Sequence, residues 1–241
     1  MNEPNPVVFL LDVDDTLLDN DAAQENYLAH IRLNYGRDAE ERYWAIFQEL
    51  FQQLGYADYL GALQRYRLEN RRDQRLLSMS AFLLDYPFAD LLYPRALEVL
   101  RYLNSAGPTV ILSDGDIIFQ PRKIKRSGIE TAVEGRVLIY VHKEEELPEV
   151  EGAYPAEHYV LIDDKIRILA AVKQIWGDRV TTIQPMQGHY AMDAKLQTQY
   201  PPADITVGEI GDLLDIDLRL LTGSGSANVH RGDAEDHRGS Q

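Results

Sequence analysis

The sequence predicts an α/β fold, namely a three-layer doubly wound parallel sheet with a small all-helical domain inserted into it. Apolar runs recur at residues 7–11, 109–113, 136–143 and 159–162. Helical patterns separate the last three runs, and strands that alternate with helices form parallel sheets covered by those helices. Between the first and second runs the pattern is helical throughout, which indicates a separate helical insertion.

The first apolar run, residues 7–11, is typical of a strand buried on both faces, and it leads directly into Asp12 and Asp14. Side chains two residues apart on a strand leave the same face, so these two carboxylates are expected side by side. Two carboxylates this close repel each other unless a cation or a shared proton lies between them. A helix cap needs only one oxygen, so capping alone does not account for the pair. The pattern favours metal binding or acid–base chemistry.

Beyond these acids the pattern becomes helical, and no strand pattern interrupts it before residue 94. We expect four helices, at about residues 21–35, 38–54, 58–72 and 76–84. Asp21, Asp38 and Asp58 are the expected N-caps of the first three, with Asp19 as an alternative for the first, because an aspartate there accepts a free backbone N–H.

From Pro94 onward, strand and helix patterns alternate. Pro94 suits the first turn of a helix that continues through residues 96–103. Strands are expected near residues 109, 137, 159 and 179, with a weak last strand at 203–207 and a short helix at 210–214. In such sheets ligands bind beyond the carboxyl ends of the strands. The polar residues that follow the apolar runs are expected at that edge.

These patterns divide the chain into three parts. Residues 1–20 and 88–221 form the α/β core, residues 21–87 form the helical domain, and residues 222–241 form a tail. The tail holds Gly, Ser, His and charged residues with almost no apolar side chain. It cannot offset its ordering entropy by burying apolar surface, so we expect it to be disordered.

Composition argues against several classes of function. The 24 Lys and Arg stand against 39 Asp and Glu, which gives a formal net charge of −15. This charge repels nucleic acid and anionic membranes, and no apolar run approaches membrane-spanning length. With no cysteine and no basic-then-apolar leader pattern, we expect a cytoplasmic protein. The basic run at residues 122–126 is more typical of a solvated helix face than of a binding patch.

Residues 12–16, Asp-Val-Asp-Asp-Thr, resemble the first motif of the haloacid dehalogenase superfamily, Asp-x-Asp-x-Thr after an apolar strand. Three later runs resemble the other motifs of that family, in the same order. Ser113 ends the second run, Lys143 ends the third, and the pair Asp163 and Asp164 ends the fourth. The resemblance covers nearly all of the chain that is expected to fold. It implies a Rossmann-like core, with the helical domain acting as a mobile cap over the active site.

The sequence departs from the common family pattern at two positions. Many members carry a further acid four residues after the fourth motif, where this chain has Ile168. Some members, such as beta-phosphoglucomutase, use an adjacent acid pair instead, and Asp163 and Asp164 fit that variant. The second departure is Asp15, where many relatives have glycine.

The resemblance implies a phosphatase that acts on a small phosphomonoester through an aspartyl-phosphate. Asp12 would be the nucleophile. Asp14 would protonate the leaving oxygen and then activate water. Ser113 would donate a hydrogen bond to a phosphoryl oxygen, and Lys143 would hold the nucleophile and neutralise the transferring group.

The same resemblance implies Mg²⁺ as cofactor, since this ion prefers oxygen ligands and the substrate phosphate. Its ligands would be Asp12, the backbone carbonyl of Asp14, and either Asp163 or Asp164. Asp14 also separates two reaction types within the family. Dehalogenases of the family lack this second acid because halide leaves without a proton, so its presence favours phosphoryl transfer.

Several alternatives stay open at this point. A phosphomutase or phosphotransferase would use the same residues, and a non-enzymatic binding protein could keep the fold. Ser113 and Asp164 could be helix caps, and Lys143 could form a surface ion pair with the glutamates that follow it.

The expected partner is a small phosphorylated metabolite, with no nucleic acid and no membrane. The oligomeric state and the substrate cannot be derived from the sequence. Tyr59, Tyr66 and Arg67 of the cap are candidates for facing the substrate, although helix surface is the stronger alternative.

Overall fold

The computed structural model describes residues 3–221. Six parallel strands form one sheet in the order β3-β2-β1-β4-β5-β6. Their bounds are β1 Asn5–Leu11, β2 Thr109–Asp114, β3 Val137–Tyr140, β4 Ala156–Ile162, β5 Val180–Pro185 and β6 Ile205–Val207. The predicted parallel α/β sheet is thereby confirmed, and β1, which carries the first motif, lies between the strands of the second and fourth motifs.

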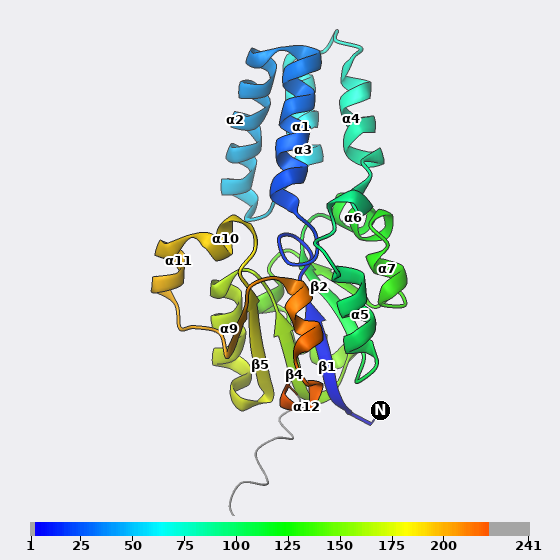
Figure 1. The fold of residues 1–241 in the computed structure, drawn as a ribbon. Helices are drawn as coiled ribbons and strands as arrows, with labels where there is room; N and C mark the ends of the chain where they lie inside the picture. Colours follow the sequence, from blue (N-terminus) through cyan, green and yellow to red (C-terminus); the bar gives the residue numbers. More distant parts are fainter. Residues whose placement is uncertain (1–2, 222–241) are drawn as a thin grey trace, which may run out of the picture.

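Helices cover both faces of this sheet (Figure 1). One face is covered by α5 Ala96–Asn104, α6 Phe119–Arg126, α7 Ile129–Ala132 and the 3₁₀ helix η4 Ile210–Asp215, and the other by α8 Leu147–Ala153 and α9 Ile166–Trp176. Along β1, Phe9 and Leu11 pack into the first layer while Val8 and Leu10 pack into the second. This alternation follows from the two-residue period of a strand. It gives the predicted three layers.

Four helices lie between β1 and β2, as predicted. They are α1 Asn20–Tyr35, α2 Arg37–Leu54, α3 Tyr59–Glu69 and α4 Leu76–Asp85. Figure 1 shows them standing together beyond the carboxyl ends of the strands. We name these four helices the helical insert. One hydrophobic cluster runs from the sheet into the helical insert, so the division into two domains stays a prediction.

Two of the three predicted N-caps are wrong. Asp58 caps α3, accepting the N–H of Gly61 at 2.6 Å. However, Asp19 rather than Asp21 caps α1. Asp21 lies in the first turn, where its carboxylate binds His189 instead. The helix α2 begins directly after Gly36, so Asp38 lies inside it.

Shorter elements complete the core. They are the 3₁₀ helices η1 Phe88–Leu91, η2 Lys143–Glu145 and η3 Gly177–Arg179, and the helices α10 Gly188–Met192, α11 Ala194–Gln199 and α12 Leu218–Leu221. Within residues 3–221, no helix combines the length and the apolar character that crossing a membrane requires. The tail that we expect to be disordered, residues 222–241, lies outside the described residues.

Candidate active site

The carboxyl end of β1 places Asp12 in the middle of the sheet edge. The backbone N–H of Asp12 still bonds to the Ile162 carbonyl of β4 at 3.0 Å, so its position is fixed by the sheet. Its side chain is 1% exposed. One carboxylate oxygen, Oδ1, accepts a hydrogen bond from Lys143 Nζ at 2.6 Å, and the other, Oδ2, has no hydrogen-bond partner. A buried carboxylate oxygen without a donor needs a cation or a reacting group nearby.

Lys143 is completely buried and joins two of the predicted motifs. Its Nζ lies 2.6 Å from Asp12 Oδ1 and 2.7 Å from Asp163 Oδ2. The alternative of a surface ion pair is therefore wrong, and Glu144 pairs with Arg167 instead. The strand β3 ends at Tyr140, and Lys143 begins the 3₁₀ turn η2 three residues later.

Asp114 holds this turn in place by accepting the backbone N–H of Lys143 at 2.8 Å. Burial alone would lower the pKa of Lys143, but the carboxylates of Asp12 and Asp163 raise it above 10.5. Lys143 is therefore a permanent cation in the site.

Three acids converge at this point. Oxygens of Asp12, Asp163 and Asp164 lie within 4.8 Å of one another, and all three side chains are buried. Neither oxygen of Asp164 has a hydrogen-bond partner. Asp164 is not a helix cap, since α9 has no side-chain cap. A set made of carboxylate oxygens suits a hard divalent cation such as Mg²⁺.

The ionisation of these acids reflects their surroundings. Burial raises the pKa of Asp163 and raises that of Asp164 well above 3.8, because neutralisation by lysine is incomplete. Burial acts on Asp12 in the same direction, yet the adjacent Lys143 and the nearby Lys165 hold its pKa below 3.8. Asp12 is thus the acid of the three that ionises most readily, and a cation would favour ionisation of the other two.

Backbone contacts fix the position of Asp164 relative to the first motif. The Asp164 N–H donates to Thr16 Oγ1 at 3.0 Å, and Gln184 Nε2 donates to the Asp164 carbonyl at 2.8 Å. Thr16, the last residue of the first motif, thus connects that motif to the fourth one.

Asp14 lies at the rim of the site, with its side chain 22% exposed. Its Oδ1 is 2.7 Å from Lys123 Nζ, which also donates to Asn20 Oδ1 at 2.9 Å. Lys123 is 1% exposed, so the prediction of a solvated helix face is wrong for this residue. It faces inward because α6 turns it toward the first motif, while Lys125 is exposed.

Ser113 is buried at the end of β2 and accepts a hydrogen bond from Gln120 Nε2 at 2.9 Å. It does not cap the following helix. Asp116 has that role, because its Oδ1 accepts the N–H groups of Ile118 and Phe119 at 2.8 and 2.7 Å. The Ser113 hydroxyl therefore does not cap a helix. It lies at the end of β2, where the other motifs meet.

Sequence reasoning missed Lys165, the residue directly after the acid pair. Its backbone N–H donates to Asp163 Oδ1 at 2.8 Å, and its ammonium lies 5.3 Å from the centre of the Tyr190 ring. Burial opposes the charge, but Asp12 and Asp164 raise the pKa of Lys165 well above 10.5. The sequence feature that could have identified Lys165 is its position directly after the predicted acid pair. Lys165 adds a second cation to the site.

The unusual Asp15 has a conformational explanation. Its φ is 61°, the left-handed region that glycine adopts freely and aspartate tolerates. Its Oδ1 accepts the N–H groups of Asn20 and Asp21 at 2.9 and 3.2 Å. Burial, with help from Asp21 and Asp14, raises the pKa of Asp15 to about 7.

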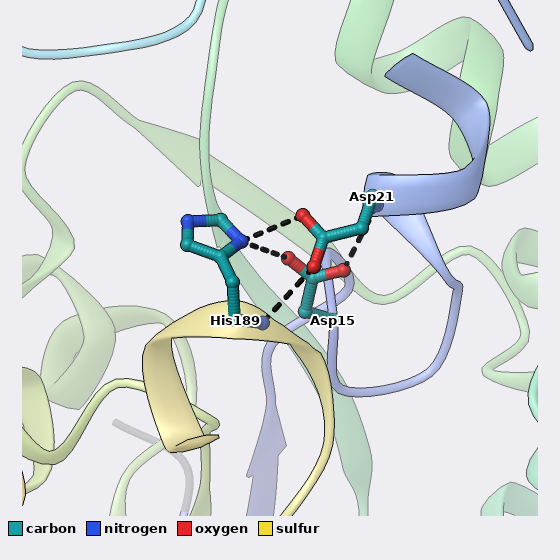
Figure 2. A group of neighbouring side chains, drawn as sticks. All are labelled: Asp15, Asp21 and His189. Atoms are coloured by element: carbon teal, nitrogen blue, oxygen red, sulfur yellow. Dashed lines mark hydrogen bonds and ion pairs between the residues drawn. The ribbon is translucent and has the colours of Figure 1, made fainter. Parts of the chain in front are cut away.

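Figure 2 shows Asp15 together with Asp21 and His189. His189 Nδ1 lies 2.6 Å from Asp21 Oδ1 and 3.7 Å from Asp15 Oδ2. Asp21 belongs to α1 and His189 to α10, so this group connects the helical insert to the core.

Comparison with known proteins agrees with this geometry. The profile of the haloacid dehalogenase-like hydrolase family matches residues 7–175. A solved structure of a haloacid dehalogenase-like hydrolase from Burkholderia xenovorans LB400 is 59% identical, with a TM-score of 0.85. The match covers 90% of this chain and 98% of that one. Curated protein sequences give no significant match.

More distant structures share the fold. L-2-haloacid dehalogenase from Xanthobacter autotrophicus is 17% identical with a TM-score of 0.56, and the match covers 86% of this chain and 96% of that one. The hydrolase YfnB from Bacillus subtilis, bound to magnesium, is 17% identical with a TM-score of 0.57, covering 88% and 98%. The matched profile and the 59% identity over nearly the whole chain establish that this protein belongs to the haloacid dehalogenase-like hydrolase family.

Proposed function

We propose that this hydrolase is a Mg²⁺-dependent phosphatase that acts on a small phosphorylated metabolite through an aspartyl-phosphate on Asp12. The proposal rests on the presence of Asp14. It stands two residues after Asp12, at the rim of the site, with its carboxylate held by Lys123. An alkoxide leaving group needs a proton whereas halide does not, so this second acid supports phosphoryl transfer over dehalogenation.

In the first step a carboxylate oxygen of Asp12 attacks phosphorus, and the bond from phosphorus to the leaving oxygen breaks. Asp12 Oδ2, which has no hydrogen bond, is the oxygen free to react. Lys143 holds the other oxygen. Asp14 gives its proton to the leaving oxygen, so the alcohol departs neutral.

In the second step Asp14, now a carboxylate, takes a proton from water. That water attacks the phosphorus of the aspartyl-phosphate, and Asp12 is released together with inorganic phosphate. Ser113 would donate a hydrogen bond to the phosphoryl group, and Lys143 and Lys165 would balance its negative charge.

The residues present fit a divalent metal ion. Asp12, Asp163 and Asp164 would hold it, because an oxygen of each lies within 4.8 Å of the others, and Asp12 Oδ2 and both oxygens of Asp164 have no hydrogen-bond partner. The carbonyl of Asp14 stays a proposed ligand. When bound, Mg²⁺ would orient the substrate phosphate and neutralise charge on it. The magnesium reported for the distant Bacillus subtilis hydrolase is in line with this choice.

Dehalogenation is the second candidate, because the Xanthobacter autotrophicus neighbour carries covalently bound chloropropionic acid. At 17% identity that likeness concerns the fold alone. A dehalogenase has no use for a proton donor beside the leaving group, and Asp14 supplies one here. The assay must also distinguish a phosphatase from a phosphomutase and from a binding protein with the same fold.

The first test compares p-nitrophenyl phosphate with 2-chloropropionate as substrates, each with Mg²⁺ and with EDTA at neutral pH. We expect hydrolysis of the phosphate ester that depends on Mg²⁺, and no chloride release. The metal dependence follows from the three buried acids, whose mutual repulsion a divalent cation relieves. Chloride release without phosphatase activity would overturn the proposal in favour of dehalogenation.

Replacing Asp14 by asparagine should reduce turnover by an amount that depends on the leaving group. For ethyl phosphate, whose alcohol must be protonated, we expect a loss of about 10²–10⁴-fold. For p-nitrophenyl phosphate, whose phenolate leaves readily, the loss in the first step should be much smaller. Burst kinetics separate that step from hydrolysis of the aspartyl-phosphate. If the rate of the first step fell by the same factor for both esters, Asp14 would not be the acid.

A further inference from the structure

A cavity lies between the helical insert and the core, and its lining includes Lys123, the residue that pairs with Asp14. It encloses about 290 Å³ of empty space, part of it open to solvent. Six aromatic rings line it: Tyr27, Tyr59, Phe82, Tyr86, Phe88 and Phe119. The first three belong to helices of the insert, and Phe88 and Phe119 belong to the core. Tyr59, for which the sequence favoured helix surface, is thus among the residues that line this space.

The position of the cavity relative to Asp14 decides what it can hold. Lys123 and Asn20 line the cavity. Lys123 Nζ also lies 2.7 Å from Asp14 Oδ1, so a residue of the lining is in direct contact with Asp14. If Asp14 protonates the leaving oxygen, the group attached to that oxygen extends toward this space. The cavity is therefore placed to receive the alcohol part of the substrate.

We infer that this cavity binds the alcohol part of the substrate and that this alcohol carries a flat aromatic ring. The inference rests on the proposed phosphatase function. Aromatic side chains bind rings by stacked and edge-to-face contacts. The rings here already pair in this way, with Tyr27 and Phe82 stacked at 6.0 Å and Tyr59 and Phe119 tilted at 5.6 Å between centroids.

A polyhydroxylated alcohol such as a sugar fits this lining poorly, because each buried hydroxyl would need a partner. The available polar groups are few. Lys123 and Asn20 are engaged with each other and with Asp14, and Gln24 accepts a hydrogen bond from the Tyr59 hydroxyl at 3.3 Å. These lining groups leave little hydrogen-bonding capacity for a substrate, which suits a flat apolar ring.

Entry of a ring requires the helical insert to move. The fully enclosed part of the cavity has room for about one water molecule. Phe119 of the core contacts Tyr59 of the insert, so separating these two layers of rings enlarges the space. Substrate binding and movement of the insert are therefore linked.

The test compares benzyl phosphate with ethyl phosphate, using the full-length protein with Mg²⁺. Both esters release an alkyl alcohol of comparable acidity, so intrinsic reactivity does not separate them. We expect kcat/KM to be about 10- to 100-fold higher for benzyl phosphate, the effect of burying one ring. Equal values, or a preference for glucose 6-phosphate over benzyl phosphate, would overturn the inference while leaving the phosphatase proposal intact.

One variant and a control locate the effect. Phe82→Leu should lower kcat/KM for benzyl phosphate about tenfold and change that for ethyl phosphate less than about twofold. Phe51→Leu removes an exposed ring of α2 that does not line the cavity, and it should change neither value.

A binding measurement makes the inference independent of turnover. Benzylphosphonate and methylphosphonate cannot be hydrolysed, and calorimetry with Mg²⁺ should give about tenfold tighter binding of the benzyl compound, lost in Phe82→Leu. If neither phosphate ester is hydrolysed but this difference is found, the phosphatase proposal fails and the cavity assignment holds. If the two phosphonates bind equally, the cavity assignment fails.

Discussion

Replacing Asp12 by asparagine is expected to abolish phosphatase turnover, with a loss in kcat of roughly 10⁴-fold or more. The amide has no anionic oxygen with which to form the aspartyl-phosphate. The fold should survive, because Lys143 keeps Asp163 as a partner 2.7 Å away and the backbone of residue 12 stays bonded to β4. The measurement is kcat for p-nitrophenyl phosphate with saturating Mg²⁺.

Asp116→Asn is the matched control for this variant. Asp116 bonds two backbone N–H groups at the start of α6, and an asparagine oxygen can accept the same bonds. We expect its kcat to stay within about twofold of the original value. Acid quenching followed by mass spectrometry should find a phosphoryl group on the peptide that contains Asp12, only when that aspartate is present. Turnover that survives Asp12→Asn would contradict the mechanism.

Much of the fold could be predicted from the sequence because this sheet is parallel and covered on both faces. Strands β1 and β4 are buried over residues 7–11 and 159–162, so these parts stand out as apolar runs. Their carboxyl ends share one edge, which is why the order of the apolar runs is enough to predict that Asp12, Ser113 and Asp163 lie near one another.

The helix caps were harder to predict, since several aspartates compete at each helix start. Asp19 and Asp21 are equally good caps by residue type. The choice between them depends on His189, which engages Asp21 from 168 residues away along the chain. Local patterns carry no information on such a contact.

The two extra cations of the site were missed for a related reason. Lys123 lies in a basic run whose average character is that of a surface. Its spacing was informative, because Gln120, Lys123 and Ile124 fall at positions that share one helix face and all three are buried. Only the position of α6 against the first motif shows that this face meets Asp14.

Replacing Lys143 by methionine is expected to be the most destabilising change in the site. Methionine fills similar volume without charge, and it leaves Asp12 and Asp163 as buried acids with no cation in contact. Removing one member of a buried ion pair costs about 3–5 kcal/mol in the free energy of unfolding. Urea unfolding of the metal-free protein near neutral pH measures this loss. Lys125→Met, on the exposed side of α6, is the control and should change stability by less than about 0.5 kcal/mol.

The pH dependence of that loss tests whether charge is its cause. In the original protein the pKa of Asp12 is lowered below 3.8, so ionised Asp12 stabilises the fold above pH 3.8. This stabilisation is lost as the pH falls through the lowered pKa. Without Lys143, burial dominates and raises the pKa of Asp12, so its ionisation destabilises the fold as pH rises through the raised value. The difference in unfolding free energy between the two proteins should therefore shrink as pH falls from neutral toward 4. Added Mg²⁺ should also reduce this difference in unfolding free energy at neutral pH, because the ion binds the same acids. A difference that is constant with pH and unaffected by Mg²⁺ would mean that Lys143 stabilises by packing rather than by charge.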